Sequence, residues 1–137
     1  MARAVLDTSI FVAREDDREI DDALIDRYDA FAVSVATMSE LYLGVLRAMA
    51  DGNAEAHERR LATYTRAAQI RRLDIDMLVG EQFAQLVSAL RDAGRKAPVQ
   101  DCWIAATAMA HGATVITQDC GGFGAMRDVQ AVAVEFV

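Results

Sequence analysis

Short apolar runs alternate along this chain with longer segments in which apolar residues recur every three or four positions. Four runs have the length and composition of buried strands: residues 2–7, 31–35, 113–117 and 129–134. Five segments have the period of helices that pack one face on a core: residues 18–29, 37–50, 53–69, 76–94 and 100–111. Strands alternating with helices favour a mostly parallel sheet covered on both faces. We therefore expect a single three-layer α/β/α domain over residues 1–137.

Capping residues refine the expected boundaries of these elements. Asn53 and Asp76 are suited to cap the helices that follow them. Thr37 or Ser39 is expected to cap the helix at 37–50, which places Glu40 in its first turn. The glycine-rich segment 121–124 predicts a turn between the last two strands.

Composition narrows the class of protein. The chain has 137 residues and a formal net charge of −7, which argues against unspecific attraction to nucleic acid or to anionic membranes. No window approaches 18 consecutive apolar residues, and no long apolar segment precedes Asp7. These observations predict a soluble cytoplasmic protein that does not associate with membranes. In a reducing cytosol, Cys102 and Cys120 are expected to be free thiols.

Four acidic residues occupy positions from which they can meet in space. Asp7 and Asp119 follow short apolar runs, where strands are expected to end, and Glu40 and Asp101 lie near the starts of helices. In an open α/β sheet, the carboxyl ends of strands and the N-termini of helices lie at one edge, where ligands usually bind. Hard cations such as Mg²⁺ and Mn²⁺ prefer oxygen ligands, and there they could activate water against a phosphodiester.

Each acid also has a purely local explanation. Asp7 could cap a helix, Glu40 and Asp101 could be favourable charges at helix N-termini, and Asp119 could form a turn. Spacing alone does not decide between these local roles and a shared pocket.

The residues around the acids do favour one interpretation. Val5-Leu6-Asp7-Thr8-Ser9, then Ser39-Glu40-Leu41 with Gly44, then Asp101 to Ala108, and then Val115 to Asp119 with Phe123 resemble the ordered motifs of the PIN-domain ribonucleases. In length and motif order the chain is similar in particular to the VapC toxins of bacterial toxin-antitoxin pairs. A single such motif is common by chance, but four in order over the whole chain are specific.

This resemblance implies a Mg²⁺- or Mn²⁺-dependent endoribonuclease. It implies that one or two ions are held by the matching carboxylates Asp7, Glu40, Asp101 and Asp119, with the hydroxyls of Thr8 and Thr117 supporting them. One residue departs from the pattern, because Gly122 stands where many relatives carry an acid. A second tightly held metal is therefore in doubt.

The resemblance also implies partners, namely an RNA substrate, a VapB-like antitoxin and a second copy of the chain in a homodimer. Arg95 and Lys96 precede Asp101 by five or six residues and could clamp the RNA backbone beside the pocket. A further arginine cluster at 59–72 could bind phosphates or simply be a solvated helix face. Trp103 could stack on a base, although its neighbours Ile104 and Ala105 favour packing in the core or at its rim.

Two functions other than a nuclease are compatible with parts of the sequence. A non-catalytic interaction protein could keep the same fold, but the intact set of four acids argues against it. A phosphatase acting on small phosphoesters would be expected to carry a second aspartate two residues after the first, where Asp7-Thr8-Ser9 has a serine.

Overall fold

Five parallel strands form the centre of the molecule. They are β1 (Arg3–Leu6), β2 (Ala30–Ser34), β3 (Arg71–Leu73), β4 (Thr114–Thr117) and β5 (Val134–Phe136). Their order across the sheet is β3-β2-β1-β4-β5. The computed structural model describes all 137 residues.

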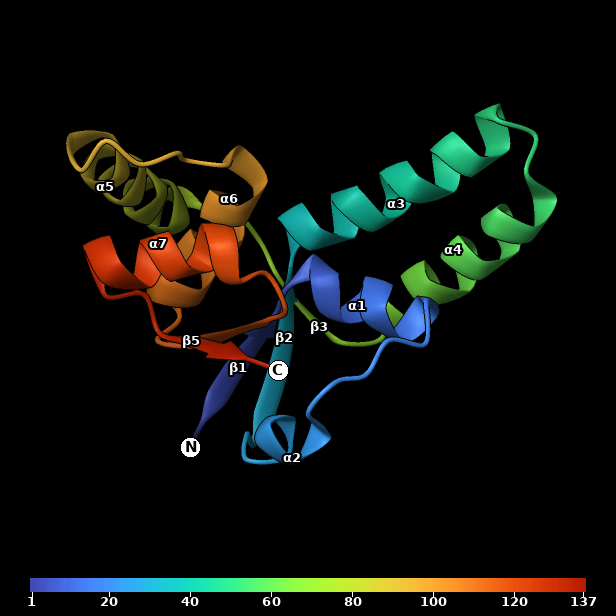
Figure 1. Ribbon diagram of the computed structural model, residues 1–137, viewed down its shortest axis with the longest axis horizontal. Coiled ribbons are helices and arrows are strands. Elements are labelled where there is room, and N and C mark those ends of the chain that lie inside the picture. The colour runs from blue at the N-terminus through green and yellow to red at the C-terminus, as the bar shows by residue number, and fades with distance from the viewer.

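Seven helices connect the strands and cover the sheet. They are α1 (Thr8–Glu15), α2 (Asp22–Ile25), α3 (Val35–Ala50), α4 (Ala54–Ala67), α5 (Met77–Asp92), α6 (Val99–Ala110) and α7 (Cys120–Gln130). Helices α1, α3 and α4 lie on one side of the sheet, and α5, α6 and α7 lie on the other (Figure 1). The predicted three-layer α/β/α architecture with a parallel sheet is therefore confirmed.

The two faces of the sheet each carry a hydrophobic core. Val5 of β1 and Val115 of β4 pack with residues of α5, α6 and α7 in a cluster of 14 buried residues. Leu6 and Ile116, the next residues along the same strands, point to the other face and join a cluster of nine. Strands buried on both faces have almost continuous apolar sequences. This explains why β1 and β4 could be recognised as short unbroken apolar runs.

The C-terminal part of the chain differs from the prediction. Residues 121–124 were expected to form a turn and 129–134 a strand, but 120–130 form α7 and β5 begins only at Val134. The carboxylate of Asp119 accepts hydrogen bonds from the backbone N–H groups of Gly121 and Gly122 and so caps this helix. Phe123 is fully buried in the core, and its burial helps to offset the low helix propensity of the glycines.

The region between β1 and β2 was also predicted incorrectly. A helix was expected over 18–29, yet only Asp22–Ile25 is helical, and the main helix of this region is α1. Asp7 caps α1 immediately after β1, because its side chain accepts a hydrogen bond from the backbone N–H of Ser9. Strand β3 was not predicted, since its two arginines are exposed and it is only three residues long.

Helix α3 begins earlier than expected. Ser34, the last residue of β2, caps it by accepting a hydrogen bond from the N–H of Ala36. Glu40 therefore lies in the second turn of α3 and not in the first. Together with α4, this helix extends away from the sheet as an arm (Figure 1).

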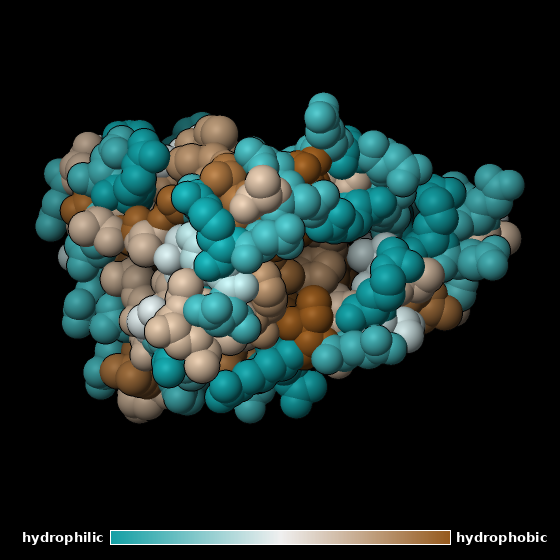
Figure 2. All heavy atoms as spheres, turned by 90° about the horizontal axis from the view of Figure 1, so that it is seen from below, coloured by the Kyte–Doolittle hydropathy of each residue, from teal (hydrophilic) through white to brown (hydrophobic).

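The edge at which the strands begin is seen in Figure 2. Hydrophilic atoms cover most of this face, and hydrophobic atoms appear on it in separate patches. None of the seven helices is both long and apolar enough to span a lipid bilayer.

Candidate active site

The four acids found in the sequence are carried by four different helices that begin near the finishing edge of the sheet (Figure 1). Asp7 is the N-cap of α1 directly after β1, and Asp119 is the N-cap of α7 two residues after β4. Asp101 lies in the first turn of α6, and Glu40 in the second turn of α3. The local capping roles therefore exist for Asp7 and Asp119, and they do not exclude a shared pocket.

The hydroxyl of Thr117 connects two of these acids. It donates a hydrogen bond to Asp7 Oδ2 at 2.8 Å and accepts one from the backbone N–H of Asp119 at 2.9 Å. Ser9 Oγ lies 3.2 Å from the same hydroxyl and accepts a hydrogen bond from the N–H of Gln118 at 3.0 Å. Because Thr117 gives its only proton to Asp7, Ser9 is the donor toward Thr117.

A second hydroxyl connects α1 to α3. Thr8 Oγ1 donates a hydrogen bond to Glu40 Oε1 at 2.8 Å and lies 3.1 Å from Thr37 Oγ1. Sequence reasoning had not identified Ser9 or Thr37 as part of this network. The hydroxyl run in Asp7-Thr8-Ser9 was the available signal for Ser9, whereas Thr37 had been read only as a helix cap.

Gly122 separates Asp101 from Asp119. A methyl group on Gly122 would lie 3.0 Å from Asp101 Oδ2 and 3.5 Å from Asp119 Oδ2. The two carboxylates therefore approach the same point of α7. A side chain at this position would press on the Asp101 carboxylate and contact that of Asp119, which gives a steric reason for glycine here.

The raised pKa values of Asp101 and Glu40 show that the acids repel one another. Burial, as the largest cause, and the negative charges of Asp7, Asp119 and Glu40 together raise the pKa of Asp101 to about 7. Burial also raises the pKa of Glu40; its hydrogen bond from Thr8 opposes this, and the charge of Asp7 adds to it. The four ion pairs of the structure include none of these acids. The pocket therefore carries negative charge that no arginine or lysine neutralises.

The donor set is suited to a hard divalent cation. Four carboxylates offer only oxygen, and Mg²⁺ needs just one or two of them when water and substrate supply its other ligands. As they stand, no three His, Cys, Asp or Glu side chains are grouped so as to hold a metal ion. Cys102 does not extend the donor set toward zinc, because burial and the charge of Asp101 raise its thiol pKa to about 11.

Other residues singled out in the sequence lie as follows. Both cysteines are free, as predicted, with Cys102 buried and Cys120 exposed. Trp103 stacks on Phe83 with the ring centres 3.7 Å apart, which confirms its packing role. Arg95 and Lys96 are exposed in the segment between α5 and α6. That segment ends at Pro98, whose Cγ would lie 3.8 Å from a methyl group on Gly122.

A groove continues from Glu40 along the arm. It has a volume of about 640 Å³ and is bordered by α1, α3 and α4, with Thr8 and Glu40 at its inner end. Arg47, Arg59 and Arg60 also line it. Arg60 is held there by donating a hydrogen bond to the carbonyl oxygen of Gly44 at 2.9 Å. Arg47, Arg59 and Arg60 belong to none of the four ion pairs.

Comparison with known proteins agrees with this geometry. The PIN domain family matches residues 4–126. Ribonuclease VapC4 of Mycobacterium tuberculosis is 45% identical over 132 residues, which cover 96% of this chain and 97% of that protein. Ribonuclease VapC5 of the same organism is 38% identical over 133 residues, covering 97% and 94%.

Solved structures give the same result. A crystal structure of a member of the VapBC family of toxin-antitoxin systems, VapBC-5 from M. tuberculosis, matches with a TM-score of 0.84 at 36% identity, covering 100% of this chain and 98% of that one. VapBC2 from Rickettsia felis, bound to a DNA fragment from its promoter, has a TM-score of 0.79 at 19% identity, with 98% of each chain covered, and supports the fold alone. The chain belongs to the PIN-domain family and, within it, to the VapC-type ribonucleases.

Asp101→Asn should raise the melting temperature of the protein in chelator, with the largest gain above pH 7. The folded protein holds a proton on Asp101 up to a pKa of about 7, whereas an ordinary aspartate releases it near 3.8. Stability is thus lost as the pH rises from the lower value through the higher one. Thermal unfolding across this range measures the effect. Asp92→Asn, at the exposed end of α5, is the control, and equal melting temperatures of wild type and Asp101→Asn above pH 7 would refute the repulsion.

Gly122→Ala should weaken Mn²⁺ binding by about 10-fold, because the added methyl group displaces the carboxylate of Asp101. Titration calorimetry measures the affinity. Gly124→Ala is a matched control in the same helix, since a methyl group there meets nothing within 4 Å. Equal affinities of the two variants would show that Asp101 is not confined by Gly122.

Proposed function

We propose that this chain is a divalent-metal-dependent endoribonuclease that acts as the toxin of a toxin-antitoxin pair. The observation that carries the proposal is that Asp7, Glu40 and Asp119 lie close enough to Asp101 for their charges to raise its pKa, at the finishing edge of the sheet and without an ion-pair partner. The names of the relatives, Ribonuclease VapC4 and VapC5, support RNA as the substrate. The VapBC structures support an antitoxin partner.

In this proposal Asp7, Glu40, Asp101 and Asp119 hold one firmly bound Mg²⁺ or Mn²⁺. When bound, such a cation supplies positive charge for a phosphodiester and activates water for hydrolysis. Thr117 orients Asp7 through its 2.8 Å hydrogen bond, and Thr8 orients Glu40 in the same way. The raised pKa of Asp101 means that it must release its proton before it can bind a cation.

RNA would approach from the segment between α5 and α6. Arg95 and Lys96 are exposed there without an ion-pair partner, and the segment leads through Pro98 to Gly122 beside the carboxylates. We propose that these two cations contact backbone phosphates. Because the whole chain has a net charge of −7, which opposes RNA binding, local contacts of this kind and the bound metal would provide the attraction.

The antitoxin would occupy the groove of the arm. Large apolar side chains stay exposed on α3 and α4: Tyr42, Leu43, Leu46, Met49 and Leu61. Of these, Leu43 lines the groove, so an amphipathic segment seated in the groove would contact Leu43 and reach Thr8 and Glu40 at the inner end.

We further propose that a second copy of the chain packs on apolar residues at the start of α5, where Met77 is 78% and Leu78 50% exposed. The proposed setting for this toxin and its antitoxin is the cytoplasm.

Asp7→Asn, Glu40→Gln, Asp101→Asn and Asp119→Asn should each reduce metal-dependent RNA cleavage by about 100-fold or more while the fold remains. Each change keeps the shape of the side chain and removes its charge. Cleavage of a defined RNA, with Mn²⁺ and with chelator, measures the effect, and Asp92→Asn should behave as wild type. Wild-type rates in two of the four variants would contradict the shared pocket. An inactive wild type would favour a non-catalytic interaction protein.

One arginine of the antitoxin should be essential for inhibition. A pocket of carboxylates is a receptor for a guanidinium group, which forms paired hydrogen bonds with carboxylates and competes with metal or phosphate. Replacing the antitoxin's arginines one at a time by alanine should relieve inhibition at one or two positions while binding through the groove persists. Full inhibition by every such variant would refute this mode of inhibition, although the nuclease assignment would still stand on cleavage with metal.

A further inference from the structure

A second hollow lies at the opposite edge of the sheet, where the parallel strands begin. It has a volume of about 330 Å³ and opens on the face that α5, α6 and α7 cover. Arg3, Ala30 and Arg71 are the first residues of β1, β2 and β3, and all three line it. The hollow is therefore separated from the four carboxylates by the length of the strands.

The sheet register explains why there is space here. Arg3 of β1 pairs with Ala30 of β2, and Ala32 of β2 pairs with Arg71 of β3. Since alternate residues of a strand face the same side, both alanines point to the face that carries Val5 and Leu73. The small side chains of Ala30 and Ala32 on β2 thus form the floor of the hollow, between Arg3 on β1 and Arg71 on β3.

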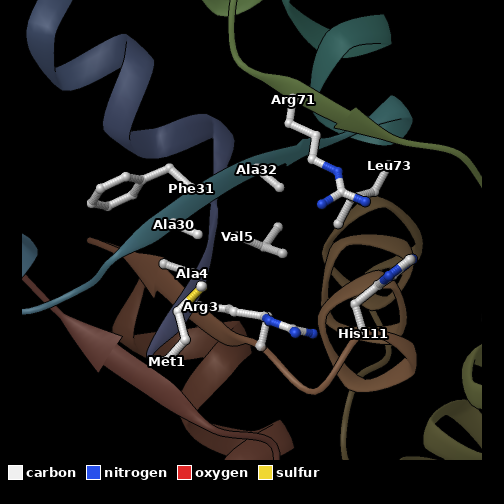
Figure 3. Close-up of a pocket in the computed structure, with 11 residues that line it drawn as sticks. Met1, Arg3, Ala4, Val5, Ala30, Phe31, Ala32, Arg71, Leu73 and His111 are labelled. Carbon is white, nitrogen blue, oxygen red and sulfur yellow. The ribbon is translucent and has the colours of Figure 1, made fainter.

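Three nitrogen-bearing side chains surround this floor. Arg3, Arg71 and His111, the residue that caps the C-terminal end of α6, all line the hollow, and Figure 3 shows the two arginines extending from β1 and β3 on the side of the floor nearest α6. None of the three belongs to an ion pair. Asp29 precedes Ala30, but its carboxylate already accepts a hydrogen bond from the backbone N–H of Ala2 at 2.8 Å. In a protein with 21 acidic and 14 basic residues, this hollow therefore brings together two arginines and a histidine that no carboxylate neutralises.

We propose that this hollow binds a small phosphate monoester with a planar or apolar body, of the size of a nucleoside monophosphate. A carboxylate is satisfied by one bidentate arginine, whereas a phosphate monoester offers three terminal oxygens to donors on different sides. Donors from β1, β3 and α6 match the second geometry. The floor of Ala30, Ala32 and Val5 accepts the apolar body, and the volume lies at the lower end of known ligand pockets.

The proposal is tested on the full-length ¹⁵N-labelled protein in chelator, with adenosine monophosphate as the probe. Titration should shift the amide signals of Ala30, Ala32 and His111 saturably. Inorganic phosphate should shift the same signals with weaker affinity, and adenosine should shift them least. Absence of saturable shifts at these amides, or equal binding of adenosine and its monophosphate, would overturn the assignment. Equal binding of glutamate would overturn the preference for phosphate.

Variants separate this site from general electrostatics. Arg71→Gln should weaken the probe's affinity by roughly 10-fold, since it removes a charge-assisted hydrogen bond. Arg91→Gln, at an exposed arginine of α5 with no ion pair, should leave it unchanged. Ala30→Val keeps a residue that suits a strand but fills the floor of the hollow, and it should abolish binding. If Arg91→Gln weakens binding as much as Arg71→Gln does, or if Ala30→Val binds normally, the hollow is not the site. RNA cleavage should stay normal in Arg71→Gln, because Arg71 lies at the edge of the sheet opposite the four carboxylates. Failure of the binding test would therefore leave the proposed nuclease activity untouched.

Discussion

The carboxylates of Asp7, Glu40, Asp101 and Asp119 repel one another at an edge where burial weakens their hydration. The surrounding structure offsets part of this cost. Asp7 and Asp119 cap helices, so backbone N–H groups and the positive ends of helix dipoles face them. Thr117 donates a hydrogen bond to Asp7, and Thr8 donates one to Glu40, so both carboxylates are partly stabilised without a cation. The site is thus built from the same contacts that start the helices, and what remains of the repulsion favours cation binding.

The parallel sheet separates two kinds of charge. At its finishing edge, helices begin and carboxylates gather, whereas at its starting edge Arg3, Arg71 and the C-terminal end of α6 come together. Both arrangements agree with the direction of the helix dipoles. Between them, the two hydrophobic cores hold the strands in register. The arm of α3 and α4 adds a groove that leads to Glu40 and is lined by no residue of the sheet.

Much of this arrangement could be predicted from the sequence. Strands β1 and β4 are unbroken apolar runs, and Asn53 and Asp76 cap α4 and α5 as expected. Strand β3 was missed because an exposed edge strand with two arginines has no apolar pattern. Helix α7 was missed because Gly121 and Gly122 suggest a turn, whereas the cap by Asp119 and the burial of Phe123 decide the outcome.

The parts of the site that the sequence did not reveal depend on contacts between distant elements. Ser9 approaches Thr117 across more than a hundred positions, and Gly122 approaches Asp101 from another helix. The groove exists because α3 and α4 extend from the sheet beside α1. The basic hollow depends on the register of β2 with β1 and β3. Periodicity and capping signals describe neighbours along the chain, so they carry no information about these pairings.

Anomalous diffraction from crystals grown with Mn²⁺ tests the shared metal pocket most directly, because it locates the cation independently of activity. The pocket formed by Asp7, Glu40, Asp101 and Asp119 predicts a strong manganese peak bound by at least two of these carboxylates, at about 2.0–2.2 Å from their oxygens. A peak bound elsewhere, or no peak among these four side chains at saturating Mn²⁺, would contradict it.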